Sequence, residues 1–513
     1  MKKSNLKLGF LAFAALALTS AYAAKPVEAA KQTSKSYSMM TKAPGTKSYG
    51  IYKRVSGGKA KGKITTTSDF KTAHIESNRS IKAKKYTYWY IYVNGRAVGW
   101  VNQNWFRRST IKAAKSVSLV NNPHYSFNTR DAISYATNSQ GTVVSNSKVQ
   151  ASVSSISSKT AGSHQVTFSY GKARATTYVT VRSDAWEGIS SADLTPVHGT
   201  SAYKPPKGHY GKSTNYRSSL TNTPETHGHS YYSNGMTFNT RLYQPVRLSL
   251  PSDEGRDIIN SVGHINEGMA IYKNMFYTSL LRKDNDMQGH VVGYDLNKLK
   301  SRYNTQKLLT MSMNSFKYYS RHIVVSPLVP TGHGQAMGAT SKYVYTLVNN
   351  HKKPNWNQSE ELVQLNKKDL TINKIWTIKL WNHSDSYPRY LHNAVIVSDD
   401  TMYGLFHNGK SHYEFWEFKR SGDSWNATEV GAMNGNFVAN RAPVQAFTYD
   451  PVHRNFYVGF NDYMMKVSRR GKFLKAYGSF YSGREIEGAG VANNHLYINF
   501  AQRAELLESN GLN

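Results

Sequence analysis

Residues 267–277 read Glu-Gly-Met-Ala-Ile-Tyr-Lys-Asn-Met-Phe-Tyr, and this stretch decides the fold because its pattern recurs. In each copy, a step of small residues is followed, after a gap, by an apolar residue or two and a tyrosine. The five copies are Glu267–Tyr277, His333–Tyr345, His392–Tyr403, Val444–Tyr457 and Glu487–Tyr497. Successive tyrosines are separated by 68, 58, 54 and 40 positions. Repeats of about 40–50 residues with several strands each are typical of β-propellers.

The repeat predicts a five-bladed β-propeller over residues 236–513, with Arg241–Leu250 closing the ring. A small residue on each inner strand would let neighbouring blades approach the crowded axis, and each tyrosine would pack between neighbouring sheets. A sixth, diverged blade is one alternative. A β-sandwich with similar strand ends is the other.

Three copies place an ionisable side chain just before the small residues: Glu267, His333 and Glu487. In a propeller this position lies near the mouth of the central channel, with Glu267 and Glu487 in adjacent blades across the closure. Two carboxyl groups that face one pocket are what glycoside hydrolysis requires. The usual hydrolase and phosphate-binding motifs are missing from the sequence. We therefore expect a non-enzymatic, ligand-binding or structural role. The alternative is a secreted polysaccharide hydrolase or lyase on the propeller that uses these three residues.

The chain is strongly basic and carries an export signal. It has 65 Lys+Arg against 31 Asp+Glu, a formal net charge of +34, which favours a polyanionic partner. Lys2, Lys3 and Lys7 precede the apolar run Leu8–Leu18, and Ala21-Tyr22-Ala23 provides a cleavage site, so residues 1–23 are predicted to be a signal peptide. For an exported protein the expected polyanions are extracellular glycans and teichoic acids, and nucleic acid is not expected.

The sequence predicts no anchor, metal or cofactor. It contains no cysteine, which excludes disulfides, Cys-based zinc sites and a lipid-modified N-terminal cysteine. No second apolar run is long enough to span a membrane. His209, His227 and His229 lie close in sequence but lack acidic partners, so we interpret them as a solvated loop.

An aromatic hairpin dominates residues 49–108, which follow a flexible basic arm at 24–48. Tyr86–Val93 is an aromatic strand, Asn94-Gly95 is a strong hairpin turn, and Arg96–Val101 is the return strand. The segment resembles the SH3-like GW module of Gram-positive surface proteins. The match lies in Trp89-Tyr90 and Gly99-Trp100-Val101. This resemblance implies non-covalent attachment to wall teichoic or lipoteichoic acid.

The composition of the same segment supports polyanion binding. Residues 25–108 hold 18 Lys+Arg against Glu28, Asp69 and Glu76. Cations attract phosphates, and aromatic rings offer stacking surfaces for sugars. The predicted wall-binding residues are Lys53, Arg54, Lys59, Lys61, Lys63, Lys82, Lys84, Lys85, Trp89, Trp100, Arg107 and Arg108. The alternative for the tryptophans is that they fill the core of a small barrel.

Residues 115–183 have short strand patterns at Val117–Val120, Ser145–Val153, Gln165–Tyr170 and Thr176–Val181. Together with Asp131–Thr137, they resemble a bacterial Ig-like domain, which implies a spacer. Residues 184–235 are rich in Gly, Pro, Ser and His and are predicted to be a linker.

The predicted fold class is all-β: an SH3-like barrel, an Ig-like sandwich and a propeller. The whole resembles secreted, wall-associated exoproteins of lactic acid bacteria, which implies an adhesin. The propeller would bind anionic host glycans such as glycosaminoglycans through basic clusters. These are Lys352, Lys353, Lys367, Lys368, Arg469, Arg470 and Lys472. The predicted location is extracellular, non-covalently attached to the cell wall.

Overall fold

A computed structural model gives the architecture. It describes residues 32–42, 48–70, 75–93, 96–107, 109–120, 126–139, 143–182, 185–189, 227–244, 265–282, 285–299, 322–348, 360–378, 380, 391, 393–407, 412–434, 444–478, 480, 482–501 and 504–512. These residues form β-strands and a few short 3-10 helices, so the all-β prediction is confirmed. No helix among them is long and apolar enough to cross a membrane. The predicted signal peptide lies outside the described residues.

The N-terminal module is a single sheet with the strand order β3-β2-β6-β5-β4-β1-β7. Its elements are β1 (Gln32–Lys42), β2 (Gly50–Ser56), β3 (Lys59–Thr66), η1 (Thr67–Phe70), β4 (Ile75–Ala83), β5 (Tyr86–Val93), β6 (Arg96–Asn102), η2 (Gln103–Trp105) and β7 (Phe106–Arg107). The predicted hairpin is present, because β5 and β6 pair up to Val93 opposite Arg96. The predicted flexible arm needs correction, since β1 lies within it and pairs with β4 and β7.

The glycine of the Gly-Trp dipeptide has a steric role in this sheet. A Cβ on Gly99 would lie 2.6 Å from the backbone oxygen of Tyr52, in the neighbouring strand β2. The next residue, Trp100, pairs with Tyr52 across these strands. The dipeptide therefore marks a point where only glycine lets β2 and β6 approach.

The second module is a small sandwich formed by three sheets. Its elements are β8 (Thr110–Ala113), β9 (Ser116–Val120), β10 (Ser126–Asn128), η3 (Thr129–Ala132), β11 (Ile133–Thr137), β12 (Val143–Val144), η4 (Asn146–Lys148), β13 (Gln150–Ala151), β14 (Ser155–Ser157), β15 (Gly162–Tyr170) and β16 (Ala173–Arg182). Val117, Phe127, Val166 and Val179 lie in its buried core. The strand predicted over residues 145–153 is wrong, because η4 and the two-residue β13 occupy most of it.

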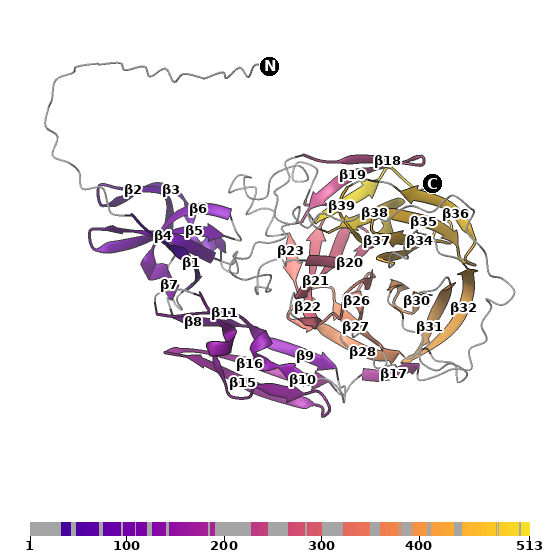
Figure 1. Ribbon diagram of the computed structural model, residues 1–513, viewed down its shortest axis with the longest axis horizontal. Coiled ribbons are helices and arrows are strands. Elements are labelled where there is room, and N and C mark those ends of the chain that lie inside the picture. The colour runs from indigo at the N-terminus through magenta and orange to yellow at the C-terminus, as the bar shows by residue number, and fades with distance from the viewer. Residues whose placement is uncertain are drawn as a thin grey trace, which may run out of the picture.

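Five blades follow, each with an inner strand at the axis (Figure 1). Blade 1 has β20 (Ile265–Tyr272), β21 (Met275–Arg282), β22 (Asn285–Asp295), β23 (Ile323–Val325) and β24 (Val329–Pro330); blade 2 has β25 (Ala336–Ala339), β26 (Tyr343–Val348), β27 (Glu360–Asn366) and β28 (Ile372–Ile378); blade 3 has β29 (Asn393–Ser398), β30 (Thr401–His407), β31 (His412–Ser421) and β32 (Ser424–Asn434); blade 4 has β33 (Ala446–Asp450), β34 (Asn455–Phe460), β35 (Tyr463–Ser468) and β36 (Phe473–Gly478); blade 5 has β37 (Ile486–Ala492), β38 (His495–Phe500), β39 (Glu505–Ser509), β19 (Met236–Tyr243) and β18 (Ser230–Ser233).

The inner strands form a closed ring. In order around the axis, β37 contacts β20, β20 contacts β25, β25 contacts β29, β29 contacts β33, and β33 contacts β37 again. Strands β25 and β29 are close enough to pair in parallel. Over the described residues the propeller is therefore five-bladed, as predicted.

The ring is closed by strands from both ends of the propeller sequence. β19 pairs with β39, with Phe238 opposite Ser509 and Tyr243 opposite Glu505. The closing strand is thus Met236–Tyr243; of the predicted Arg241–Leu250, residues 245–250 lie outside the described residues. The predicted linker also needs correction, because it contains β18 and β17 (Ala185–Ile189), and β17 pairs in parallel with β28 of blade 2.

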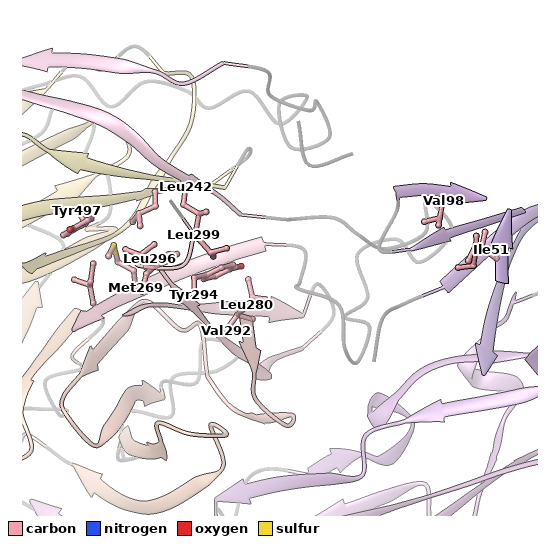
Figure 2. Packing of buried hydrophobic residues seen from close by; sticks show 14 of the residues in the cluster. Ile51, Val98, Leu242, Met269, Leu280, Val292, Tyr294, Leu296, Leu299 and Tyr497 are labelled. Carbon is pink, nitrogen blue, oxygen red and sulfur yellow. The ribbon is translucent and has the colours of Figure 1, made fainter. Parts of the chain in front are cut away.

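The small residues and tyrosines of the repeat act as the sequence predicts. A Cβ on Gly268 would overlap the backbone oxygen of Gly334 in the next blade, and a Cβ on Gly488 would lie 2.7 Å from Met269. The repeat tyrosines Tyr277, Tyr345, Tyr403, Tyr457 and Tyr497 are all buried. Figure 2 shows Tyr497 of blade 5 beside Met269 of blade 1, where the ring closes.

The sandwich docks on blade 1 instead of standing apart as a free spacer. Val117 of β9 forms a parallel bridge with Leu328, just before β24. Leu328 is 4% exposed and belongs to the hydrophobic core of the sandwich. The propeller therefore completes the core of its neighbour.

Candidate functional site

Two carboxylic acids meet where the first and last inner strands adjoin. Glu267 lies in β20 and Glu487 in β37, and each is followed by one of the glycines that let the strands close up. The pairing register shifts at both places, between Asn266 and Met269 and between Ile486 and Gly488. Such β-bulges redirect a side chain that would otherwise alternate with its neighbours.

The two acids are part of a buried hydrogen-bonded cluster. Glu267 is 5% and Glu487 is 4% exposed, and their side chains are hydrogen-bonded to each other. Nε2 of Gln335 lies 3.4 Å from Oε2 of Glu487 and 2.9 Å from Oε1 of Gln445. Nε2 of His333 lies 3.6 Å from Oε2 of Glu267. Residues from blades 1, 2, 4 and 5 therefore converge at one level of the axis.

The inner-strand residue that lies opposite each repeat tyrosine shows which positions of the blades are equivalent. Tyr277, Tyr345, Tyr457 and Tyr497 pair with Ala270, Gly338, Thr448 and Gly490 of their inner strands. The residues three positions earlier are Glu267, Gln335, Gln445 and Glu487.

The predicted alignment of the repeat copies places His333 level with the two glutamates, and this alignment is wrong by two positions. It followed the small residues, whereas the tyrosines fix the register. Gln335 stands ten positions before Tyr345, as Glu267 stands before Tyr277, so counting back from the tyrosine would have found it. The equivalent residue of blade 3, His392, lies outside the described residues.

Burial and mutual proximity change the acidity of this pair. Burial raises the pKa of Glu487 well above its ordinary value of 4.5, and the negative charge of Glu267 raises it further. Like-charged carboxyl groups in contact share one proton, because both cannot ionise together at low cost. The shared proton lies between the two acids, so toward other groups the pair accepts hydrogen bonds, as Glu487 does from Nε2 of Gln335.

This geometry does not match the two-carboxylate arrangement of glycosidases. Those enzymes hold the two groups about 5–5.5 Å or about 6.5–9.5 Å apart, with the scissile bond between them. The carboxyl groups of Glu267 and Glu487 are instead close enough to form a hydrogen bond with each other. Within the described residues, no group of three or more His, Cys, Asp or Glu side chains could hold a metal ion.

A second candidate site is the cationic surface of the N-terminal module. We use this name for Lys53, Arg54, Lys59, Lys61 and Lys63 on β2 and β3, with Lys82, Lys84 and Lys85 at the end of β4 and the turn that follows. All eight side chains are exposed. The two groups meet, because the side chain of Lys84 lies against Gly58 in the turn between β2 and β3. Arg107 is described only by its backbone, in β7, and Arg108 lies outside the described residues.

The cationic surface contains a like-charge pair that folding alone would not select. Arg54 and Lys61 lie opposite each other on β2 and β3. Like charges directly opposite in an antiparallel pair are destabilising. Among the side chains described there, no carboxylate forms an ion pair with either residue. The arrangement is therefore suited to an external anion.

The predicted aromatic contacts need correction. Trp89 is 1% and Trp105 is 0% exposed, so both are core residues and Trp89 cannot stack on a sugar. Trp100 is 6% exposed, and the guanidinium of Arg79 lies 5.5 Å from its ring and 4.0 Å from the ring of Tyr90. The tryptophans stabilise the module.

Of the seven basic residues predicted to bind glycans on the propeller, three are exposed, two are held by contacts within the blades and two lie outside the described residues. Lys352 and Lys353 lie outside the described residues. Nη2 of Arg469 is 2.8 Å from Oε2 of Glu417, so its charge is partnered. Nζ of Lys367 donates to the backbone oxygen of Thr340 at 3.2 Å. Lys368, Arg470 and Lys472 are exposed.

Family comparisons match the two N-terminal modules. Residues 31–107 match the GW (Gly-Tryp) dipeptide domain, and residues 126–181 match the bacterial Ig-like domain, group 3. GW domains are cell-wall-binding modules, so the match supports a cell-wall-associated surface protein. No curated protein matches the chain significantly.

The propeller is similar to solved structures in fold alone. BamB from Moraxella catarrhalis is 10% identical and covers 56% of this chain and 95% of its own, with a TM-score of 0.25. A nidogen/laminin complex structure is 10% identical and covers 53% and 85%, with a TM-score of 0.25. A gluconolactonase from Xanthomonas campestris is 9% identical and covers 56% and 96%, with a TM-score of 0.29.

The last similarity corrects the expectation that this chain is not an enzyme. One of the similar structures is an enzyme, so that expectation no longer stands. At 9% identity and this TM-score, no reaction and no catalytic residue is carried over to this chain.

Proposed function

We propose that this protein is secreted and held on the bacterial wall by its cationic surface, which binds teichoic or lipoteichoic acid. The observation that carries the proposal is that Arg54 and Lys61 lie opposite each other, without an ion pair to any described residue, on a surface of eight exposed cations. A polyphosphate chain supplies the missing counter-charges along its length. Arginine and lysine form charge-assisted hydrogen bonds to phosphate oxygens.

The proposal is tested with the full chain and three matched charge removals. Arg54→Gln, Lys61→Gln and Lys63→Gln together should lower binding to purified walls by at least tenfold. The control combines Lys115→Gln, Lys148→Gln and Lys172→Gln, three exposed cations of the sandwich, and should bind like the parent. Equal losses in both triples would show general charge attraction and refute a specific surface.

Salt provides an independent test of the mode of attachment. Screening shortens the reach of exposed charges from about 8 Å at physiological ionic strength to about 3 Å at 1 M. A 1 M salt wash should therefore release the protein from whole cells. Retention through that wash would contradict ionic attachment.

We further propose that the propeller acts as an adhesin for sulfated host glycans such as glycosaminoglycans. Support comes from Lys368, Arg470 and Lys472, whose side chains are exposed. Replacing these three with glutamine should lower the salt concentration that elutes the full chain from heparin. An unchanged elution, alongside earlier elution of the Arg54/Lys61/Lys63 variant, would assign heparin binding to the N-terminal module and refute the adhesin role of these residues.

A further inference from the structure

A pocket occupies the axis beyond the carboxyl pair, along the same five inner strands. Its volume is about 280 Å³, close to the lower end of about 300 Å³ for small-molecule sites. Its wall is mainly apolar and includes Met269, Met337, Ile396, Val397 and Ala492. Protein interiors are otherwise close-packed, so an open apolar pocket of this size is a candidate ligand-binding site.

Two ammonium groups lie near the ring of one tyrosine that lines this pocket. Tyr272 and Lys273 line it at the turn between β20 and β21. Nζ of Lys367, from the turn after β27 in the next blade, lies 4.4 Å from the centre of the Tyr272 ring, and Nζ of Lys273 lies 5.7 Å from it. The lysines of two different blades therefore place their ammonium groups near the same tyrosine ring.

These two cations lack an anionic partner within the part of the chain that the structure describes. Neither forms an ion pair there, and Lys367 is bonded to the neutral backbone oxygen of Thr340. Asp399, the acid near Thr340, accepts hydrogen bonds from the hydroxyls of Thr340 at 2.6 Å and Tyr345 at 2.9 Å. Burial and then the charge of Lys273 lower the pKa of Lys367, which is the signature of two uncompensated neighbours.

We propose that this pocket binds a small amphiphilic anion, with an aliphatic body in the apolar channel and a carboxylate head at Lys273 and Lys367. The apolar wall gains from removing hydrocarbon from water, and the anionic head neutralises the two ammonium groups. Thr448 and Asn493 are among the few polar side chains of the wall, which disfavours a bare sugar. None of the residues of this site is among those proposed above to bind teichoic acid or heparin.

Calorimetry on the full chain tests the proposal with octanoate, octanol and inorganic phosphate as probes. Octanoate should bind, and acetate and butyrate should bind progressively more weakly as the aliphatic body shortens. Equal binding of octanol would refute the role of the two lysines. Equal binding of phosphate, or no dependence on chain length, would refute the role of the channel. No binding of octanoate would overturn the proposal.

Variants locate the site. Lys273→Gln and Lys367→Gln should each weaken octanoate binding by about tenfold, which corresponds to about 1.4 kcal/mol, because each variant removes one charge-assisted hydrogen bond. Lys298→Gln, at an exposed position in the turn after β22 of blade 1, is the matched control and should leave octanoate binding unchanged. Ala492→Leu, which fills the channel, should abolish octanoate binding at an unchanged melting temperature. Octanoate binding that survives both lysine variants would contradict the assignment.

Discussion

The N-terminal module and the closing blade of the propeller use charged residues in opposite ways. On the module, Arg54 lies opposite Lys61 on the neighbouring strand; both are exposed to solvent, and no described acid forms an ion pair with either. In blade 5, Arg484 is 2% and Glu505 is 0% exposed, and Nη2 of Arg484 lies 2.6 Å from Oε2 of Glu505. Surface charges without an ion pair are available to bind a partner, whereas the buried ion pair stabilises the fold.

The buried pair ties the two ends of the propeller to each other. Glu505 belongs to the last strand, and its carboxylate also contacts Nδ1 of His229 at 3.0 Å, just before β18. Tyr231 of β18 lies 3.3 Å from Nη2 of Arg484. Burial alone would raise the pKa of Glu505, but the hydrogen bond from His229 and the charge of Arg484 outweigh it and hold that pKa below its usual value. The network thus links strands that are far apart in sequence.

The largest expected effect breaks this network. Arg484→Ala leaves Glu505 buried without its cation and should destabilise the propeller by about 3–5 kcal/mol. Chemical denaturation of the full chain measures the loss. Arg470→Ala, at an exposed position, should change the stability by less than about 0.5 kcal/mol. Similar effects of the two variants would remove the distinction between buried and surface charge.

A smaller effect concerns the approach of the blades at the axis. Gly268→Ala adds a methyl group that overlaps the backbone oxygen of Gly334. Overpacking of this kind costs about 1–3 kcal/mol, which a thermal melt detects. Ser341→Ala, in an exposed turn of blade 2, serves as the control. A neutral Gly268→Ala variant would show that the blades are more loosely packed than the structure indicates.

The axial acids should make stability depend on pH in a defined direction. Because the pKa of Glu487 is raised in the folded protein, the folded state keeps a proton that the unfolded chain releases above about 4.5. The stabilisation is therefore full at low pH and is lost as the pH rises through the raised pKa. Glu487→Gln, which mimics the neutral acid, should melt a few degrees above the wild type at pH 8 and together with it at pH 4. A constant difference across this range would contradict the shared proton.

The smallest effect separates stability from binding on the cationic surface. Lys61→Glu replaces a like-charge pair by an ion pair with Arg54 and should stabilise the hairpin by about 0.2–1 kcal/mol. Hydrogen exchange of β2 and β3 measures this gain. Lys59→Glu makes the same charge change opposite Ser56, where no cation is relieved. Both variants should weaken teichoic acid binding, and only Lys61→Glu should slow exchange.

Sequence patterns predicted the structure best where the local residues allow only one backbone arrangement. The Tyr86–Val93 strand, the Asn94-Gly95 turn signal and Gly99-Trp100 predicted the N-terminal hairpin, because alternation and turn type set its register. They did not predict β1, since its residues lack an apolar period and pair only because β4 and β7 offer free edges. The prediction that Trp89 binds the wall is wrong for a different reason, because composition does not show which face of a strand is buried.

The sequence by itself determined the class of the fold, the five-fold repeat and the excess of positive charge, because periodicity and composition are properties of the chain. Only the tertiary structure decided that Gln335 and Gln445 join Glu267 and Glu487, and that Lys273 and Lys367 share one tyrosine. These groups come from different blades. The four axial residues are between 42 and 220 positions apart in the sequence, and Lys273 and Lys367 are 94 positions apart. Their meeting depends on β-bulges and on ring closure, which act through space. The spacing to the repeat tyrosine aligns Gln335 with the two glutamates, but it does not show that their side chains meet.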